Sequence, residues 1–228
     1  MKLAALFPID WLARFGSGPV GMGHDVATTT KESSNPSALA IIEKVGLNFI
    51  TRLLMTWKTS DDRISKAILR HAAESLLKAD KRPRKLAVDN SNEKFFASQV
   101  QRELAALVPV DLLAGGETIK YLGEEMSVKN YLGNLVINTM TDHRLAIPND
   151  GVVKIDFRLV KRDRGGFVTD VGPGGRHGDT FDAVKLALHS LISASGPAEA
   201  SAASTGHRTS PKVDPDLPDE RSTPKIYA

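Results

Sequence analysis

Three aspartates stand at positions where α/β proteins assemble active sites. Asp25 ends a short apolar stretch, and Asp89 ends the apolar run 85–89. Asp179 follows the glycine-rich loop 172–178 and begins a stretch with helical periodicity. Carboxylates at strand ends and at a helix N-terminus gather at one edge of an α/β sheet, so we expect these three to meet.

Several carboxylates in one place are suited to holding hard divalent cations. Mg²⁺ prefers oxygen ligands and keeps several waters, so a few aspartates suffice to bind it. Two such ions about 4 Å apart can activate a water and stabilise the leaving oxygen during phosphodiester cleavage. Taken alone, each of the three aspartates is better explained as a turn residue or a helix cap. The prediction of phosphodiester chemistry therefore depends on all three meeting.

The apolar periodicity predicts which elements position these side chains. The expected elements are strands over residues 19–27, 37–45, 48–57, 85–89 and 108–114, helices over 61–79, 91–107 and 126–142, a hairpin of strands 152–160 and 166–171, and a last helix over 179–193. An opening meander followed by alternating strands and helices indicates one α/β domain with a mixed sheet flanked by helices and a hairpin before the last helix.

The chain divides by composition into three expected parts. Residues 1–18 read as a lead-in or linker, and residues 19–195 as the folded domain. Residues 196–228 contain five of the 12 prolines and almost no large apolar side chains. Such a segment buries too little surface to offset its ordering entropy, so we expect a flexible tail.

The overall composition excludes several classes of protein. The 228 residues include no cysteine, which excludes disulfides, thiolate zinc sites and a cysteine nucleophile. No apolar run approaches the length of a membrane span, and the N-terminal apolar stretch is too short for a signal peptide. A cytoplasmic protein without a membrane partner is therefore expected. The net charge is only +3, so clusters of basic residues are more informative than the total.

One string of residues is more distinctive than any other, His177-Gly-Asp-Thr-Phe-Asp-Ala-Val-Lys-Leu-Ala-Leu188. It resembles the closing motif of the nuclease domain of tailed-phage large terminases, His-x-Asp-x-x-(Asp)-Ala-x-x-x-Ala-Leu. The segment 23–27, Gly-His-Asp-Val-Ala, is similar to the first-strand motif of that family, and 86–89, Leu-Ala-Val-Asp, to its second metal-ligand strand. The segment 6–12 resembles the stretch that joins the packaging ATPase to the nuclease in Mu-like phage terminases, so the resemblance covers roughly residues 6–193.

The resemblance implies an RNase H-like fold and a metal-dependent endonuclease that cuts double-stranded viral DNA during genome packaging. It implies that Asp25, Asp89 and Asp179 hold two Mg²⁺ or Mn²⁺ ions. Asp182 lies on the same helical face as Asp179 and is either a further ligand or a solvated residue. His24 should point to the opposite side of its strand from Asp25 and is not expected to bind metal.

The same resemblance suggests how DNA is bound. Similar domains carry a β-hairpin beside the active site, and the expected hairpin 152–171 has Lys161, Arg162 and Arg164 near its tip. Contacts of these cations with phosphates would supply most of the affinity. Arg176, next to the closing motif, is a further candidate for phosphate contact. Asp156 and Asp170 are expected on the surface of this hairpin.

A complete large terminase also has an ATPase domain with a phosphate-binding Gly-x-x-x-x-Gly-Lys-[Ser/Thr] loop, and this chain has none. We therefore expect an excised nuclease domain or a remnant that does not drive packaging alone. In a full motor its partners would be an ATPase domain, the small terminase subunit and the portal, in the cytoplasm of the host bacterium.

Two other interpretations remain open. One is a different RNase H-like nuclease, such as a Holliday-junction resolvase, although those enzymes more often have glutamate where this chain has Asp89. The other is a catalytically dead DNA-binding module that keeps the fold and the basic hairpin but binds no metal.

Overall fold

The computed structural model describes residues 3–27 and 35–193, so the expected tail 196–228 lies outside the described residues. The chain divides after Ser195 into two units, of which only the first contains described residues.

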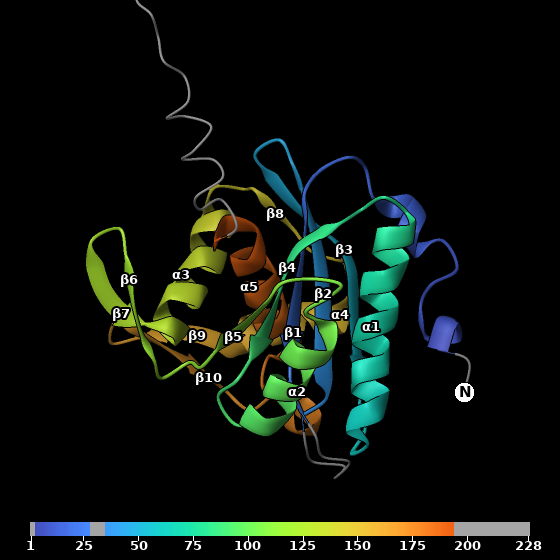
Figure 1. Cartoon of the computed structure of the whole chain (residues 1–228). Helices are drawn as coiled ribbons and strands as arrows, with labels where there is room; N and C mark the ends of the chain where they lie inside the picture. Colours follow the sequence, from blue (N-terminus) through green and yellow to red (C-terminus); the bar gives the residue numbers. More distant parts are fainter. Residues whose placement is uncertain (1–2, 28–34, 194–228) are drawn as a thin grey trace, which may run out of the picture. The chain divides into compact units, whose positions relative to one another are not determined.

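A six-stranded sheet forms the centre of the fold (Figure 1). Its strands, in spatial order, are β5 (Val110–Leu113), β4 (Pro83–Asp89), β1 (Val20–Asp25), β2 (Ser37–Val45), β3 (Asn48–Trp57) and β8 (Leu145–Ala146). β1 pairs with β2 in antiparallel orientation and with β4 in parallel orientation. The expected mixed sheet is thus confirmed, with β1 at its centre.

Helices cover both faces of this sheet (Figure 1). On one face lie α1 (Asp62–Lys78) and α2 (Lys94–Leu104), and on the other lie α3 (Val128–Thr141), α4 (Gly151–Leu159) and α5 (Asp179–Ile192). The alternation of side chains along β2 explains both cores, because Leu39 and Ile41 pack toward α1 while Ala40 and Ile42 pack toward α5.

The segment expected as a lead-in contributes to the first of these cores. It forms two 3-10 helices, η1 (Leu3–Leu6) and η2 (Trp11–Arg14), and its side chains Phe7, Trp11 and Phe15 are buried. Phe7 also contacts the ring of His71 on α1. Residues 7–15 therefore pack as part of the domain.

The region before the last helix differs from the sequence-based expectation. Residues 152–160 were expected as a strand, but helix α4 extends through Leu159. Asp150 begins this helix, since its carboxylate accepts hydrogen bonds from the backbone N–H groups of Val152 and Val153. The hairpin that follows is shorter than expected and consists of β9 (Val160–Asp163) and β10 (Gly166–Thr169).

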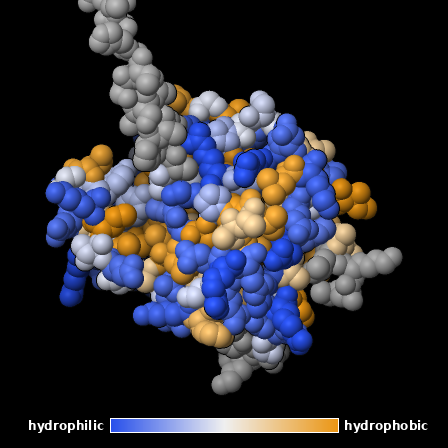
Figure 2. Space-filling model, viewed as in Figure 1, coloured by the Kyte–Doolittle hydropathy of each residue, from blue (hydrophilic) through white to orange (hydrophobic). Residues whose placement is uncertain are grey.

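A second ribbon was not expected. Strands β6 (Thr118–Tyr121) and β7 (Glu124–Ser127) pair across a turn at Leu122 and Gly123, both of which have positive φ. Figure 2 shows hydrophilic side chains over most of the visible face, with apolar ones gathered beside this ribbon.

In the chain between β10 and α5, the 3-10 helix η3 (Pro173–Gly175) forms part of the glycine-rich loop. Among the residues that the structure describes, no helix has both the length and the apolar character needed to span a membrane.

Candidate active site

Asp25 and Asp89 lie at the same edge of the sheet. Their strands, β1 and β4, are parallel neighbours, and His24 is in register with Val88 one residue earlier. Each aspartate is the last residue of its strand. The sequence-based expectation that these two carboxylates meet is supported by this register.

The first turn of α5 brings two more carboxylates to this edge, because α5 packs directly on β1. A Cβ atom at Gly23 would lie 2.2 Å from the backbone N of Ala187 and 2.3 Å from the backbone O of Ala183. Only glycine on the strand, facing the small residues Ala183 and Ala187 on the helix, permits such a close approach. Asp179 and Asp182 lie in the first turn of this helix.

The electrostatics of Asp25 show which carboxylates surround it. Burial raises its pKa well above the usual range, and the negative charge of Asp182 raises it further. The charge of Lys185 opposes this shift, and smaller contributions from Asp89 and Asp179 add to it. Asp182 therefore acts on Asp25 more strongly than Asp179 does. The sequence motif alone had favoured Asp179 as the ligand and left the role of Asp182 open.

Asp25, Asp89, Asp179 and Asp182 form the acidic cluster. Lys185 lies within this cluster, and the sequence motifs did not indicate it. Its Nζ lies 2.6 Å from Oδ1 of Asp182, and its side chain is only 14% exposed. Burial alone would lower its pKa, but Asp182, Asp25 and Asp89 outweigh that effect and raise it, so the ammonium group is charged. A lysine three residues after an aspartate, on an otherwise apolar helix face, was the only signal in the sequence.

Asp179 occupies a different environment from Asp182, nearer to Asp156. Its side chain is 2% exposed, and its Oδ2 has no hydrogen-bond partner among the described residues. Burial and the neighbouring charge of Asp156 raise its pKa to about 6. Among the described residues the nearest cation is Arg176, whose Nη2 lies 4.0 Å from the Oδ2 of Asp179. A buried carboxylate oxygen without a donor costs free energy unless a ligand satisfies it.

Asp156 was expected on the surface of a hairpin, and this expectation is wrong. Its side chain is fully buried on α4 and accepts two hydrogen bonds from Arg176, at 2.7 and 2.6 Å. It also accepts hydrogen bonds from the backbone N and the Oγ1 of Thr180. Gly178, the N-cap residue of α5, has no side chain, so Asp156 caps this helix from another element. Asp170, in contrast, is about half exposed and pairs with Lys161.

Arg176 was predicted to contact DNA phosphate, but its guanidinium group is already engaged. Both of its interacting nitrogens bind Asp156, and its side chain is 23% exposed. The geometry favours a structural role, in which Arg176 holds the loop before α5 against α4.

A cleft of about 210 Å³ opens beside the acidic cluster. It is bounded by the loop after β4, the start of α3, the β9–β10 hairpin and α5; its lining includes Asp89, Ser91, Asn92, Lys129, Phe167, Thr169, Asp182 and Lys185. The hairpin is fixed there by Phe167, whose ring covers Gly133 of α3. The expected position of a hairpin beside the acidic residues is thus observed, and its Lys161, Arg162 and Arg164 are exposed.

His24 lies on the opposite face of β1 from Asp25, as expected. Its ring stacks on Trp57 at a centroid distance of 5.4 Å, and its Nδ1 lies 3.0 Å from the carbonyl oxygen of Ala38. Burial lowers its pKa to about 4, so the imidazole is neutral at pH 7. His24 is a core residue and takes no part in the acidic cluster.

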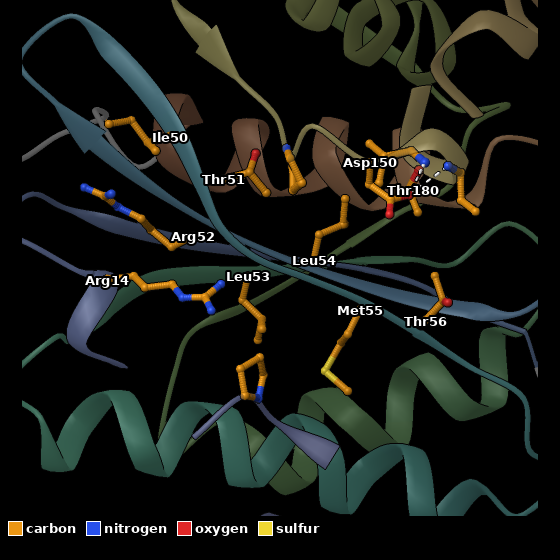
Figure 3. Close-up of a pocket in the computed structure, with 14 residues that line it drawn as sticks. Arg14, Ile50, Thr51, Arg52, Leu53, Leu54, Met55, Thr56, Asp150 and Thr180 are labelled. Atoms are coloured by element: carbon orange, nitrogen blue, oxygen red, sulfur yellow. Dashed lines mark hydrogen bonds between the residues drawn. The ribbon is translucent and has the colours of Figure 1, made fainter. Parts of the chain in front are cut away.

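A larger hollow, of about 650 Å³, follows strand β3 (Figure 3). Arg14 and Arg52 lie toward one end of it, and Asp150 and Thr180 toward the other. Its lining contains none of the four clustered aspartates. Arg52 is paired with the buried Glu43 at 2.7 Å. The hollow therefore lacks the grouped carboxylates that metal-dependent chemistry requires.

The acidic cluster fits a hard divalent cation by the chemistry of its donors. Within residues 3–27 and 35–193, no three His, Cys or acidic side chains are already close enough to enclose an ion. However, burial and neighbouring carboxylates raise the pKa values of Asp25 and Asp179, and the buried Oδ2 of Asp179 lacks a partner among the described residues. Added positive charge would relieve both the repulsion between the carboxylates and the unpartnered state of the Asp179 oxygen. Carboxylate oxygens are the ligands that Mg²⁺ and Mn²⁺ prefer.

Comparison with known proteins identifies similar solved structures. The structure of a large terminase from a thermophilic bacteriophage superposes with a TM-score of 0.54 at 12% identity, covering 83% of this chain and 45% of that one. The human cytomegalovirus terminase nuclease domain, Mn-soaked and with an inhibitor bound, superposes with a TM-score of 0.45 at 12% identity, covering 78% of this chain and 84% of that one. The nuclease domain of the bacteriophage SPP1 large terminase, with bound Mn, superposes with a TM-score of 0.44 at 12% identity, covering 82% of this chain and 93% of that one.

No protein-family model and no curated protein sequence matches the chain. The chain has a terminase nuclease-like fold, and it spans less than half the length of the large terminase from the thermophilic phage. The fold expected from the three sequence motifs is thereby confirmed.

Proposed function

We propose that this chain is a metal-dependent endonuclease that cuts double-stranded DNA, and that it is the nuclease part of a phage packaging terminase. The observation that carries the proposal is the gathering of Asp25, Asp89, Asp179 and Asp182 at one sheet edge beside a cleft. The terminase nuclease-like fold supports the same conclusion.

The carboxylates of this cluster would hold two Mg²⁺ or Mn²⁺ ions. When bound, the ions would supply positive charge to the scissile phosphate and acidify a water for the attack on phosphorus. Asp89 is prepared for ligation, because its Oδ1 accepts a hydrogen bond from the backbone N of Ser91 at 2.8 Å. That bond fixes the carboxylate and leaves its second oxygen for a ligand.

The remaining residues position the cluster and the substrate. Asp156 and Arg176 fix the start of α5, and with it the carboxylates of Asp179 and Asp182. The exposed Lys161, Arg162 and Arg164 on the hairpin beside the cleft would contact DNA phosphates. Such contacts carry no base information, so we expect little sequence preference.

The partners belong to the proposal as well. In a packaging motor, the expected partners are an ATPase domain, a small terminase subunit and a portal. The setting would be the cytoplasm of a host bacterium.

Nicking of supercoiled plasmid in Mn²⁺ tests the proposal. Asp25→Asn, Asp89→Asn, Asp179→Asn and Asp182→Asn should each lower cleavage by about a hundredfold or more, because each removes an anionic metal ligand without changing the size of the side chain. Asp170→Asn is the matched control, since Asp170 is half-exposed on the hairpin, and this variant should cleave like the wild type. Circular dichroism would establish that all five variants are folded.

The outcome separates the alternatives. Full activity in Asp25→Asn or Asp182→Asn would contradict the proposed site. Preference for a four-way junction over linear duplex would favour a resolvase. DNA binding without Mn²⁺ binding or cleavage in the wild type would favour a dead DNA-binding module.

A further inference from the structure

Lys185 places a positive charge inside the acidic cluster. Its Nζ donates a hydrogen bond to Oδ1 of Asp182 at 2.6 Å, and the charges of Asp25 and Asp89 also act on it. The side chains of both members of this pair are largely buried, 14% exposed for Lys185 and 27% for Asp182. Charges in such a place interact strongly because little water screens them.

This arrangement neutralises part of the charge that a divalent cation would neutralise. Asp25, Asp89 and Asp182 together carry three negative charges when ionised, and Lys185 offsets one of them. A cation that enters the cluster meets the repulsion of the ammonium group. It also finds an oxygen of Asp182 already engaged as a hydrogen-bond acceptor.

The cleft offers the lysine a place to move. Lys185 and Asp182 both line the cavity of about 210 Å³, and the four-carbon stem of lysine can change rotamer without disturbing α5. The second lysine of the cleft, Lys129, is exposed, and among the described residues no ion pair is found for it. Proximity to the cleft alone therefore does not account for the position of Lys185.

We propose that Lys185 is a built-in counter-ion for the metal-free cluster, and that a divalent cation must displace it from Asp182 in order to bind. The inference rests on the proposed function and adds a regulation of the same site. The lysine stabilises the empty cluster and lowers its affinity for metal. It thereby raises the metal concentration at which the enzyme becomes active.

Calorimetric titration of the whole chain with Mn²⁺ tests this proposal. Lys185→Met keeps the length and removes the charge, and it should bind Mn²⁺ at least about tenfold more tightly than the wild type, a difference equal to about 1.4 kcal/mol. Lys185→Arg keeps the charge and should bind like the wild type. Lys129→Met removes a charge from the same cleft without touching the cluster and should also leave the affinity unchanged.

The outcomes distinguish this inference from the proposed function. Equal or weaker Mn²⁺ binding by Lys185→Met, with normal binding by the wild type, would overturn the counter-ion role and leave the nuclease proposal standing. Absence of binding to every variant at millimolar Mn²⁺ would overturn both.

A second measurement uses the unmutated side chain, in case Lys185→Met does not fold. With ¹³C-labelled lysine Cε groups, Mg²⁺ should shift one lysine resonance in the wild type, identified by its absence from the spectrum of Lys185→Arg. Asp182→Asn should show that resonance near its shifted position before any metal is added. Binding of Mg²⁺ that leaves every lysine resonance unchanged would contradict displacement.

Discussion

Asp156 carries its negative charge inside the protein, where Arg176 and Thr180 together donate four hydrogen bonds to its two oxygens. This carboxylate holds no proposed metal ligand directly. It joins α4 to the first turn of α5, from which Asp179 and Asp182 extend. The geometry of the acidic cluster therefore depends on a charged residue outside it.

Removing this carboxylate should destabilise the fold strongly. Asp156→Ala leaves the guanidinium of Arg176 without its partner and the first turn of α5 without its cap, so we expect a loss of about 3 kcal/mol or more. Asp170→Ala is the matched control, an aspartate with an exposed lysine partner, and should change stability by about 0.5 kcal/mol at most. Urea unfolding measures both, and equal losses would contradict the assignment.

At this scale the sequence predicts some residues well and others not at all. The positions of Asp25 and Asp89 at strand ends follow from apolar runs that stop at a carboxylate, and the register of β1 and β4 agrees with that expectation. Burial of Asp156 and Lys185 was missed because a hydrophobic pattern treats a charged side chain as exposed. Asp156 pairs with Arg176, 20 residues away in the sequence, and this pairing cannot be seen until α4 packs beside the start of α5. Lys185 pairs with Asp182 on its own helix, and its burial follows only from the packing of that helix on the sheet.

The contact between α5 and β1 is the element-scale feature on which the site depends. Gly21 and Gly23 lie under the helix, and a side chain at either would overlap atoms of α5. The closeness of helix and strand brings the carboxylates of Asp179 and Asp182 within electrostatic range of Asp25.

Adding one methyl group should therefore separate these elements. In Gly23→Ala the new Cβ would meet backbone atoms of α5, which cannot rotate away, so we expect a loss of about 1–3 kcal/mol. Cleavage should fall as well, because Asp182 would move away from Asp25. Gly116→Ala is the control, since a Cβ there has nothing within 4 Å. Thermal unfolding and plasmid nicking measure the two effects, and a fully active, stable Gly23→Ala would refute this explanation.

The elements themselves were predicted unevenly. The long helices and the central strands lie within a few residues of the expected bounds, because their apolar periodicity is strong. Residues 152–160 alternate apolar and polar side chains as a strand does, yet all of them except Val160 lie in α4, whose buried residues are Val153 and the charged Asp156. The β6–β7 ribbon has only four residues in each strand and none of them is fully buried, so its hydrophobic pattern is too short to detect.

At the scale of the whole molecule, two groups of basic side chains can be compared among the described residues. The cations Lys161, Arg162 and Arg164 are exposed on the β9–β10 hairpin, whose residues Val160, Phe167 and Thr169 line the cleft. A second group, Lys78, Lys81 and Arg82, lies where β4 begins, at the other end of the sheet from Asp89. Each group contains three basic residues, so replacing either group removes the same charge.

Because the two groups contain equal numbers of basic residues, they allow a controlled test of DNA binding. Replacing the three hairpin cations with Gln should weaken affinity for duplex DNA and lower the slope of log K against log salt by about 2–3, because phosphate contacts are lost. Replacing Lys78, Lys81 and Arg82 with Gln removes the same net charge and should change the slope by less than about 1. Fluorescence anisotropy between low and moderate salt measures both. Equal changes would mean that net charge, rather than the hairpin, controls binding.

The convergence of carboxylates on a metal can be observed directly by anomalous diffraction from a crystal of this chain soaked in Mn²⁺. We predict anomalous density between Asp25, Asp89 and the first turn of α5, with carboxylate oxygens of Asp25, Asp89, Asp179 and Asp182 within about 2.0–2.6 Å of an ion and the Nζ of Lys185 moved away from Asp182. Anomalous density elsewhere, or none at saturating Mn²⁺, would contradict the proposal that these aspartates form a nuclease site.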